Sequence, residues 1–192
     1  IKMIKEQAKS EKPFLCWATF YRPHQPYNPL QKYMDMYNVS EWGVGTKKGS
    51  GIKIPESFYE PTKNLPPLLQ SQRNGGNKVW NMDKAFKNEQ LWRNYIGAYY
   101  ALVTEIDHCV GEILNALEEA DLEEETIVIY TSDHGDFVGN HGMVEKAAAG
   151  QNVYEDILNI PLIIRFPGKT KNGKRTAELV TLADVLPTLI EM

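Results

Sequence analysis

Apolar side chains recur at helical spacing over one long stretch, residues 88–119. They are separated by three or four positions: Leu91, Tyr95, Ile96, Leu102, Ile106, Val110, Ile113, Leu114 and Leu117. This spacing places them on one face of an α-helix. Residues 1–10 predict a short helix by the same pattern, and residues 182–192 predict a last amphipathic helix with Pro187 in its early part.

Three short apolar runs predict strands. Residues 14–20 form a continuous apolar run after Pro13, and its length and aromatic content predict a strand buried on both faces. Residues 126–131 and 161–166 predict two more strands. The long helix separates the first run from the second, so we expect a right-handed crossover and parallel pairing, whether or not the two strands are neighbours. The pattern predicts an α/β fold.

Residues 29–87 lose this periodicity and are rich in proline and glycine. Segments of this length inside a domain tend to be functional lids or binding loops. The segment also contains four large aromatic side chains: Trp42, Phe58, Tyr59 and Trp80. These either line the mouth of a substrate site or pin the loop to the core, and the second interpretation is favoured for each one taken singly.

The composition excludes some classes of partner. The chain is 42% hydrophobic and 24% charged, with a formal net charge of -4, so no strong field attracts nucleic acid or acidic lipid. No apolar stretch is long enough to span a bilayer. The two cysteines, Cys16 and Cys109, are predicted to be buried free thiols because both fall in apolar patterns.

The strongest chemical signal follows the strand predicted at residues 126–131. Asp133 offers a hard oxygen and His134 a nitrogen, and Gly135 permits a tight backbone turn after them. At the carboxyl end of a strand, both side chains can turn into one cavity and bind a metal ion. Alternatively, Asp133 caps the turn and His134 packs. A histidine ligand points towards manganese, zinc or iron, since calcium prefers oxygen ligands.

Three further residues extend this hypothesis. Lys146 follows a glycine-containing loop, where its ammonium can complete a pocket for a tetrahedral anion or simply lie on the surface. His141 either donates a proton or hydrogen-bonds the loop. His24 stands between Pro23 and Pro26, which fix the backbone around it; this suits either a ligand-binding imidazole or a surface turn.

Several blocks together resemble the sulfatase family of the alkaline-phosphatase superfamily. Listed in chain order, these blocks are PFL at 13–15, PH at 23–24, DHG at 133–135, GNHG at 139–142, Lys146, YE at 154–155, IPLIIRFPG at 160–168 and ADVLPTL at 183–189. Their order and spacing cover essentially the whole chain. The resemblance implies an alkaline-phosphatase-like fold, with a mixed, mostly parallel sheet flanked by helices, and a sulfuric ester hydrolase activity.

The resemblance also implies roles for the site residues. Asp133 and His134 would be two ligands of a divalent cation, usually calcium in this family, with manganese as the alternative. His24 would contact the sulfate group or the leaving oxygen, and Lys146 would bind a sulfate oxygen. His141 is grouped with the substrate-binding residues, although the family pattern gives it no defined role. The expected partner is a small-molecule or glycan sulfate ester.

The chain departs from the family pattern at the nucleophile. The family uses a cysteine or serine in a Cys/Ser-x-Pro-x-Arg motif, converted to formylglycine, and neither Cys16 nor Cys109 fits it. The paired acidic residues that supply the other metal ligands are also missing. We therefore expect residues 1–192 to be part of a sulfatase catalytic domain, without the nucleophile segment or the C-terminal subdomain, and inactive alone.

Two other functions stay open on the sequence. The intact protein either cleaves phosphate or phosphonate esters, or it is a non-catalytic relative that holds sulfated glycans. The sequence leaves the compartment open, and only the family resemblance points to a periplasmic, secreted or lysosomal one.

Overall fold

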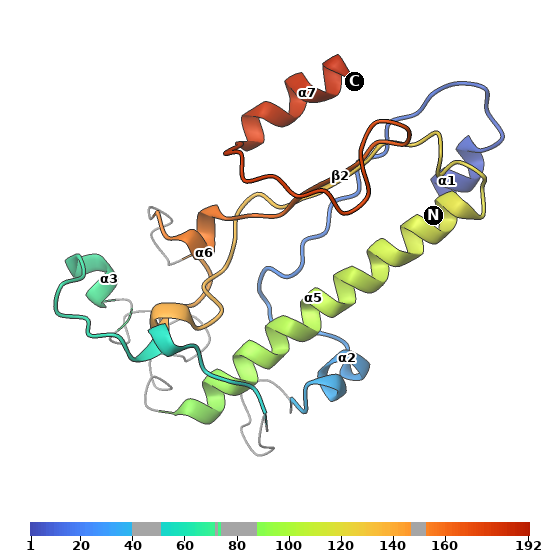
Figure 1. Cartoon of the computed structure of the whole chain (residues 1–192). Helices are drawn as coiled ribbons and strands as arrows, with labels where there is room; N and C mark the ends of the chain where they lie inside the picture. The colour runs from blue at the N-terminus through green and yellow to red at the C-terminus, as the bar shows by residue number, and fades with distance from the viewer. Residues whose placement is uncertain (40–50, 72, 74–87, 147–152) are drawn as a thin grey trace.

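One long helix organises the computed structural model, which describes residues 1–39, 51–71, 73, 88–146 and 153–192. This helix, α5 (Glu89–Glu118), has 30 residues and crosses the molecule from end to end (Figure 1). The Asn88 side chain caps its start by accepting hydrogen bonds from the backbone N–H groups of Gln90 and Leu91, which satisfies two donors of the first turn. The helix predicted over residues 88–119 is confirmed.

The other helical segments in the described part of the chain are short. They are α1 (Lys2–Gln7), α2 (Gln31–Met36), η1 (Glu56–Tyr59), α3 (Pro67–Ser71), η4 (Asn140–Gly142), α6 (Glu155–Leu158), η5 (Leu182–Asp184) and α7 (Val185–Glu191). The first and last of them confirm the helices predicted near the two ends of the sequence. Three of them, α2, η1 and α3, fall within residues 29–87, so the described part of that segment alternates short helices with loops.

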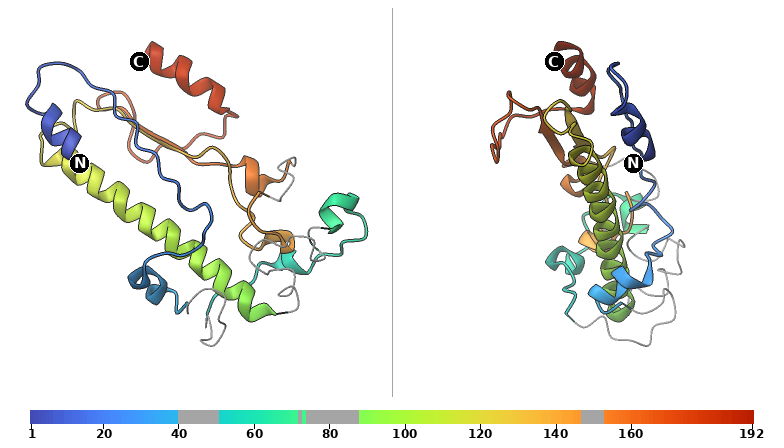
Figure 2. Two further views of the ribbon diagram at one scale, coloured as in Figure 1. Left: turned by 180° about the vertical axis from the view of Figure 1, so that it is seen from behind. Right: turned by 90° about the vertical axis from the view of Figure 1, so that its right-hand side faces the viewer.

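Two strands form the sheet within the described ranges. β1 (Val128–Thr131) and β2 (Leu162–Arg165) confirm the strands predicted at residues 126–131 and 161–166. They pair antiparallel, with Val128 opposite Arg165 and Thr131 opposite Leu162. The resulting ribbon runs along one side of α5, with α7 on its far side (Figures 1 and 2).

The strand predicted at residues 14–20 is wrong, and so is its parallel pairing. These residues form neither a helix nor a strand. Leu15 is 83% exposed and Trp17 is 84% exposed, which contradicts burial on both faces. Among the described residues the ladder joins only β1 and β2, so residues 14–20 pair with no strand there.

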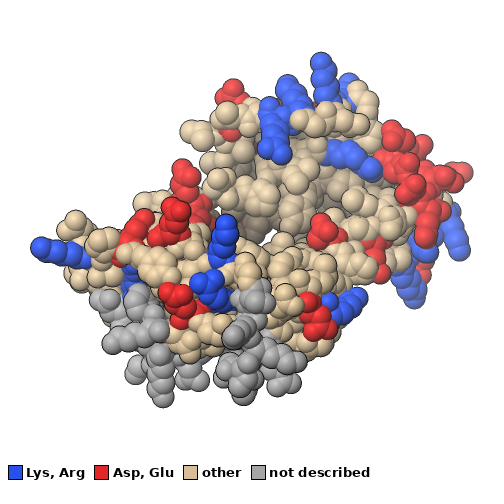
Figure 3. Space-filling view, turned by 60° about the horizontal axis from the view of Figure 1, so that its bottom comes forward, with Lys and Arg blue, Asp and Glu red and all other residues tan. Residues whose placement is uncertain are grey.

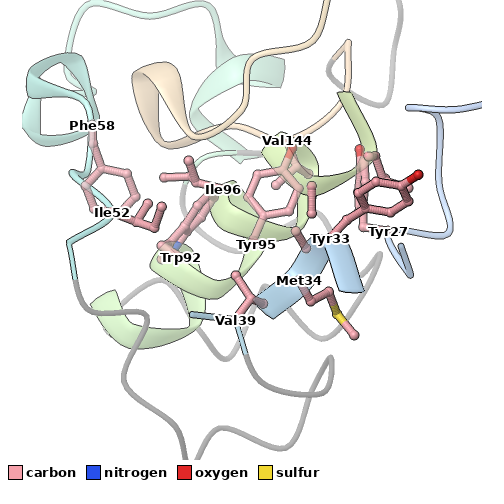
Figure 4. Close-up of a cluster of buried hydrophobic side chains, with 13 residues drawn as sticks. Tyr27, Tyr33, Met34, Val39, Ile52, Phe58, Trp92, Tyr95, Ile96 and Val144 are labelled. Atoms are coloured by element: carbon pink, nitrogen blue, oxygen red, sulfur yellow. The ribbon is translucent and has the colours of Figure 1, made fainter. Parts of the chain in front are cut away.

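The main hydrophobic core lies against the first half of α5 (Figure 4). Trp92, Tyr95 and Ile96 of the helix form its centre, and Phe58 packs edge-on against Trp92 with ring centroids 5.0 Å apart. Phe58 therefore pins its segment to the core, as the favoured interpretation predicts. Tyr59 instead stays exposed and donates a hydrogen bond to Glu89.

Trp42 and Trp80 lie outside the described residues. Within the core, Gly97 of α5 is required for close packing, since a Cβ there would collide with the side chain of Val39.

A second, smaller cluster lies at the other end of α5, where Ile4 of α1 packs with Ala116 and Leu117. The two cysteines are free thiols, as predicted, but the prediction that both are buried is wrong. Cys16 is exposed because it belongs to the unpaired run, and Cys109 is partly exposed.

The distribution of charged side chains on the surface agrees with the small formal net charge of -4. On the face shown in Figure 3, basic side chains form separate groups rather than one continuous basic surface. None of the helices in the described part of the chain has both the length and the apolar character needed to cross a bilayer.

Candidate functional site

The turn after β1 is held by backbone contact with α6. The Gly135 N–H donates a 2.8 Å hydrogen bond to the carbonyl oxygen of Ile157. A Cβ at position 135 would collide with the carbonyl oxygen of Asp156, so this close approach requires glycine. The turn that carries Asp133 and His134 is thereby fixed against α6.

The His134 ring is oriented by its own backbone. Its Nδ1 lies 2.7 Å from the carbonyl oxygen of Gly135, and since a carbonyl can only accept, Nδ1 donates. In the neutral ring Nε2 then carries a lone pair, as a metal-ligating imidazole requires. The Lys146 Nζ lies 3.1 Å from this Nε2, and the Asp133 Oδ2 lies 3.7 Å from it. The structure therefore brings these three predicted site residues together.

Asp133 presents a carboxylate to solvent, with a side chain that is 84% exposed. Its Oδ1 accepts hydrogen bonds from the His134 backbone N–H at 3.0 Å and from the Ser132 hydroxyl at 3.4 Å. Burial acts to raise the pKa of Asp133, but the neighbouring His134 and these hydrogen bonds outweigh it and lower the pKa. Asp133 thus caps its own turn, as the alternative interpretation has it, while its second oxygen stays beside the imidazole of His134.

His24 lies on a separate loop after the unpaired run. Its Nδ1 is 3.0 Å from the carbonyl oxygen of Gln25, and its ring lies 4.9 Å from that of Tyr21. Both contacts stay within its own loop, so its approach to Asp133, His134 and Lys146 stays a prediction.

His141 connects three segments of the chain. Its Nδ1 is 2.8 Å from the Glu60 carboxylate, and its Nε2 is 3.5 Å from the Asp156 carboxylate of α6. Its backbone N–H donates to the Ser57 hydroxyl of η1, and its ring packs against Tyr154. These contacts match the loop-bonding interpretation of His141, and the substrate-binding assignment stays a prediction.

Asp136 is the residue of this region that sequence reasoning missed. Its carboxylate accepts hydrogen bonds from the Tyr27 hydroxyl at 3.1 Å, the Tyr95 hydroxyl at 3.0 Å and the Val138 backbone N–H at 2.9 Å. Burial raises the pKa of Asp136, against the effect of these hydrogen bonds. The available signal was an acidic residue directly before the apolar pair Phe137 and Val138.

The donors at Asp133 and His134 suit a divalent cation only in part. A carboxylate oxygen and an unprotonated imidazole nitrogen are both accepted ligands of manganese or zinc, and the carboxylate suits calcium. Within the described residues, however, no group of three or more His, Cys, Asp or Glu side chains could hold a metal ion. The pair is therefore an incomplete ligand set that needs further donors.

Comparison with known proteins finds sulfatases. An arylsulfatase from Clostridium perfringens is 32% identical over 94% of the chain, and arylsulfatase K from Gallus gallus is 35% identical over 98% of it. The chain spans about a third of the length of these curated relatives (34% in both). A solved 2-O GAG sulfatase matches with a TM-score of 0.72 at 27% identity, over 99% of this chain and 40% of that one.

These matches cover the described turn, the sheet and α5 together. The fold is alkaline-phosphatase-like, of which the chain contains a part. The profile described as Sulfatase matches residues 1–192, and the chain belongs to the sulfatase family.

Proposed function

We propose that the intact protein hydrolyses sulfate esters, with Asp133 and His134 as ligands of a divalent cation and with Lys146 as an anion-binding residue. The observation that carries this proposal is the meeting of three groups at one point. The His134 Nε2 lies 3.1 Å from the Lys146 ammonium and 3.7 Å from the Asp133 carboxylate. Family membership gives these groups a common substrate chemistry.

Each side chain has a distinct task in this proposal. Asp133 and the Nε2 of His134 would hold the cation, which when bound supplies positive charge to an oxygen of the sulfate group. Lys146 donates a hydrogen bond to a second sulfate oxygen, and His24 faces the sulfate group or the leaving oxygen. Negative charge grows on these oxygens as the ester bond breaks, so fixed positive groups stabilise the transition state.

The nucleophile in this proposal is a formylglycine supplied by a segment outside this chain. No Cys/Ser-x-Pro-x-Arg motif occurs in residues 1–192. Accordingly, we propose that these residues are part of one catalytic domain, completed elsewhere in the intact protein by the nucleophile segment, the remaining metal ligands and a C-terminal subdomain. Calcium is the proposed cation on family grounds, with manganese as the alternative.

The test is turnover of nitrophenyl sulfate by the intact protein. We expect turnover to fall by at least about 100-fold after chelation and to return on addition of Ca²⁺ or Mn²⁺, the two ions being compared side by side. His134→Ala should abolish this recovery. Full turnover by the chelated protein would exclude the cation role, and absence of turnover with either ion would exclude the activity.

Phosphate or phosphonate ester hydrolysis is the second candidate function. It is favoured by one observation: a lysine ammonium beside a metal-capable pair recognises a tetrahedral anion by charge, without distinguishing sulfur from phosphorus. Paired rates on nitrophenyl sulfate and nitrophenyl phosphate separate the two activities. Tight binding of a sulfated glycan with no turnover of either ester would instead identify a non-catalytic binding protein.

The proposed substrate is a small-molecule or glycan sulfate ester. The glycan option is supported by the 2-O GAG sulfatase among the matched structures. Release of inorganic sulfate from sulfated glycosaminoglycans, measured beside release from nitrophenyl sulfate, ranks the two classes.

A further inference from the structure

The carboxylate of Asp136 joins three parts of the chain that are far apart in sequence. Its Oδ2 accepts a hydrogen bond from Tyr27, and its Oδ1 accepts from Tyr95 and from the backbone of Val138. Tyr27 belongs to the loop of His24, Tyr95 belongs to α5, and Asp136 itself follows the turn of Asp133 and His134. One side chain therefore links both proposed halves of the site to the scaffold helix.

The two tyrosine rings of this junction are buried, and Asp136 is half-buried. Tyr27 is 1% exposed and Tyr95 is 0% exposed, and their rings meet edge to face with centroids 5.0 Å apart. Both residues belong to the cluster drawn in Figure 4, which packs on the first half of α5. The hydroxyl groups thus approach Asp136 from a fixed apolar surface.

Removal of a carboxylate from water, even in part, is costly unless hydrogen bonds compensate it, and an apolar side chain of similar size often stabilises a fold equally well. Three convergent donors compensate Asp136, and they also specify one arrangement of the segments that carry them. A network of this kind fixes relative position more effectively than an apolar contact, because hydrogen bonds are directional.

We propose that Asp136 is a positioning residue, which sets the His24 loop against the Asp133–His134 turn through the hydroxyl of Tyr27. This inference rests on the proposed function, because it assigns His24 to the same site. Tyr27 lies three positions after His24, so a shift of its ring moves the imidazole. Tyr95 donates a hydrogen bond to the same carboxylate from α5, a helix that carries none of the proposed site residues.

A double-mutant cycle on the intact protein tests this. We expect Tyr27→Phe to lower kcat/KM for nitrophenyl sulfate about tenfold when His24 is present, and to cause no further loss in a His24→Ala background. Tyr95→Phe is the matched control: it removes a hydroxyl from the same carboxylate and should change kcat/KM by less than about threefold. Unfolding free energies of all variants show whether the two Phe substitutions cost similar stability.

Equal losses from Tyr27→Phe in both backgrounds, or no loss in either, would overturn the inference. So would equal losses from the two Phe substitutions. If the intact protein turns over no sulfate ester, the proposed function fails separately, and the cycle is measured on the Kd for inorganic sulfate in the presence of Ca²⁺. The same pattern in Kd then supports the positioning role, whereas unchanged Kd values, or no sulfate binding at all, overturn it.

Discussion

The ammonium of Lys146 lies 3.1 Å from Nε2 of His134, the ring nitrogen that a bound metal would use. Since Nδ1 donates to the carbonyl oxygen of Gly135, Nε2 has a single lone pair to offer. Lys146 and a metal ion cannot both bind that lone pair. A cation bound to Nε2 would therefore displace the Lys146 ammonium from His134.

Replacement of Lys146 by Ala should strengthen divalent cation binding while it weakens catalysis. Removal of a nearby positive charge is worth about 1 kcal/mol at a solvent-exposed site, or about fivefold in affinity. We expect Ca²⁺ and Mn²⁺ titrations by calorimetry to show this gain, and kcat/KM for nitrophenyl sulfate to fall about 100-fold. Weaker cation binding in Lys146→Ala would mean that the lysine supports the metal rather than competing with it.

Replacement of His134 by Gln should weaken the same cation binding by at least about tenfold, because the amide is a poorer ligand than the imidazole nitrogen. The control is His108→Gln on α5, a histidine that lies 3.8 Å from Glu112 and belongs to no proposed site. Calorimetric titration with Mn²⁺ measures the Kd of both variants. An unchanged Kd in His134→Gln would remove His134 from the ligand set.

Gly135→Ala should disrupt the turn, since the added methyl group meets the backbone of Asp156 rather than a flexible side chain. We expect a loss of about 1–3 kcal/mol in the free energy of unfolding, with a parallel loss of cation affinity. Gly111→Ala is the matched substitution: Gly111 lies within α5 with no atom near the added methyl group. It should raise stability by about 0.5–1 kcal/mol. Equal effects of the two substitutions would contradict the packing of the turn on α6.

His141→Gln should lower the free energy of unfolding by roughly 1–2 kcal/mol, because both ring nitrogens face carboxylates, those of Glu60 and Asp156. In a Glu60→Gln background the loss should shrink, since one partner is already changed. Denaturant unfolding measures the loss of stability in His141→Gln, alone and in the Glu60→Gln background. KM for nitrophenyl sulfate is measured on the same variants. Unchanged stability with a raised KM would instead support the substrate-binding prediction for His141.

The protein should lose stability at alkaline pH through three tyrosines, of which Tyr27 and Tyr95 are buried and Tyr99 is half-buried. Burial, followed by the charge of Asp136, raises the pKa values of Tyr27, Tyr95 and Tyr99. Above the unfolded value of about 10, the unfolded chain releases protons that the folded chain retains. The stabilisation is thus complete below that pH and is lost as pH rises, by up to about 1.4 kcal/mol per pH unit for each tyrosine.

Denaturant unfolding between about pH 8 and 11 measures this slope, and tyrosinate absorbance follows the ionisation itself. Tyr27→Phe should reduce the slope by the contribution of one tyrosine, up to about 1.4 kcal/mol per pH unit. A slope of zero, or ionisation of these tyrosines at their ordinary pKa, would show that the three rings are more exposed in solution than in the structure.

The parts of the fold that depend on local pattern could be predicted from the sequence. The helix α5 follows from the spacing of its apolar residues, and β1 and β2 follow from short apolar runs ended by turn residues. The state of residues 14–20 could not be predicted, because burial of an apolar run depends on a partner strand elsewhere in the chain. Exposure of Leu15 and Trp17 reflects the absence of such a partner among the described residues.

The candidate site likewise has one part that local sequence predicts and one part that depends on distant residues. The meeting of Asp133, His134 and Lys146 was predictable, since a strand end and a short loop bring them together. The role of Asp136 was not, because an acidic residue is expected to be solvated, whereas this carboxylate accepts hydrogen bonds from hydroxyl groups at positions 27 and 95. Local sequence carried no sign of these distant donors.

The helix α5 also sets the distance and the relative orientation of the two hydrophobic clusters at its ends. Its start is anchored by Trp92 and its end by Leu117, in two clusters with no residue in common. Each inserted residue would turn the far end by about 100° and advance it by about 1.5 Å. Insertion of a single residue between these anchors would rotate Leu117 away from its contact with Ile4. Insertion of a whole turn would mainly lengthen the helix and keep that contact on the same face. Natural variation in the length of this helix should therefore come in whole turns.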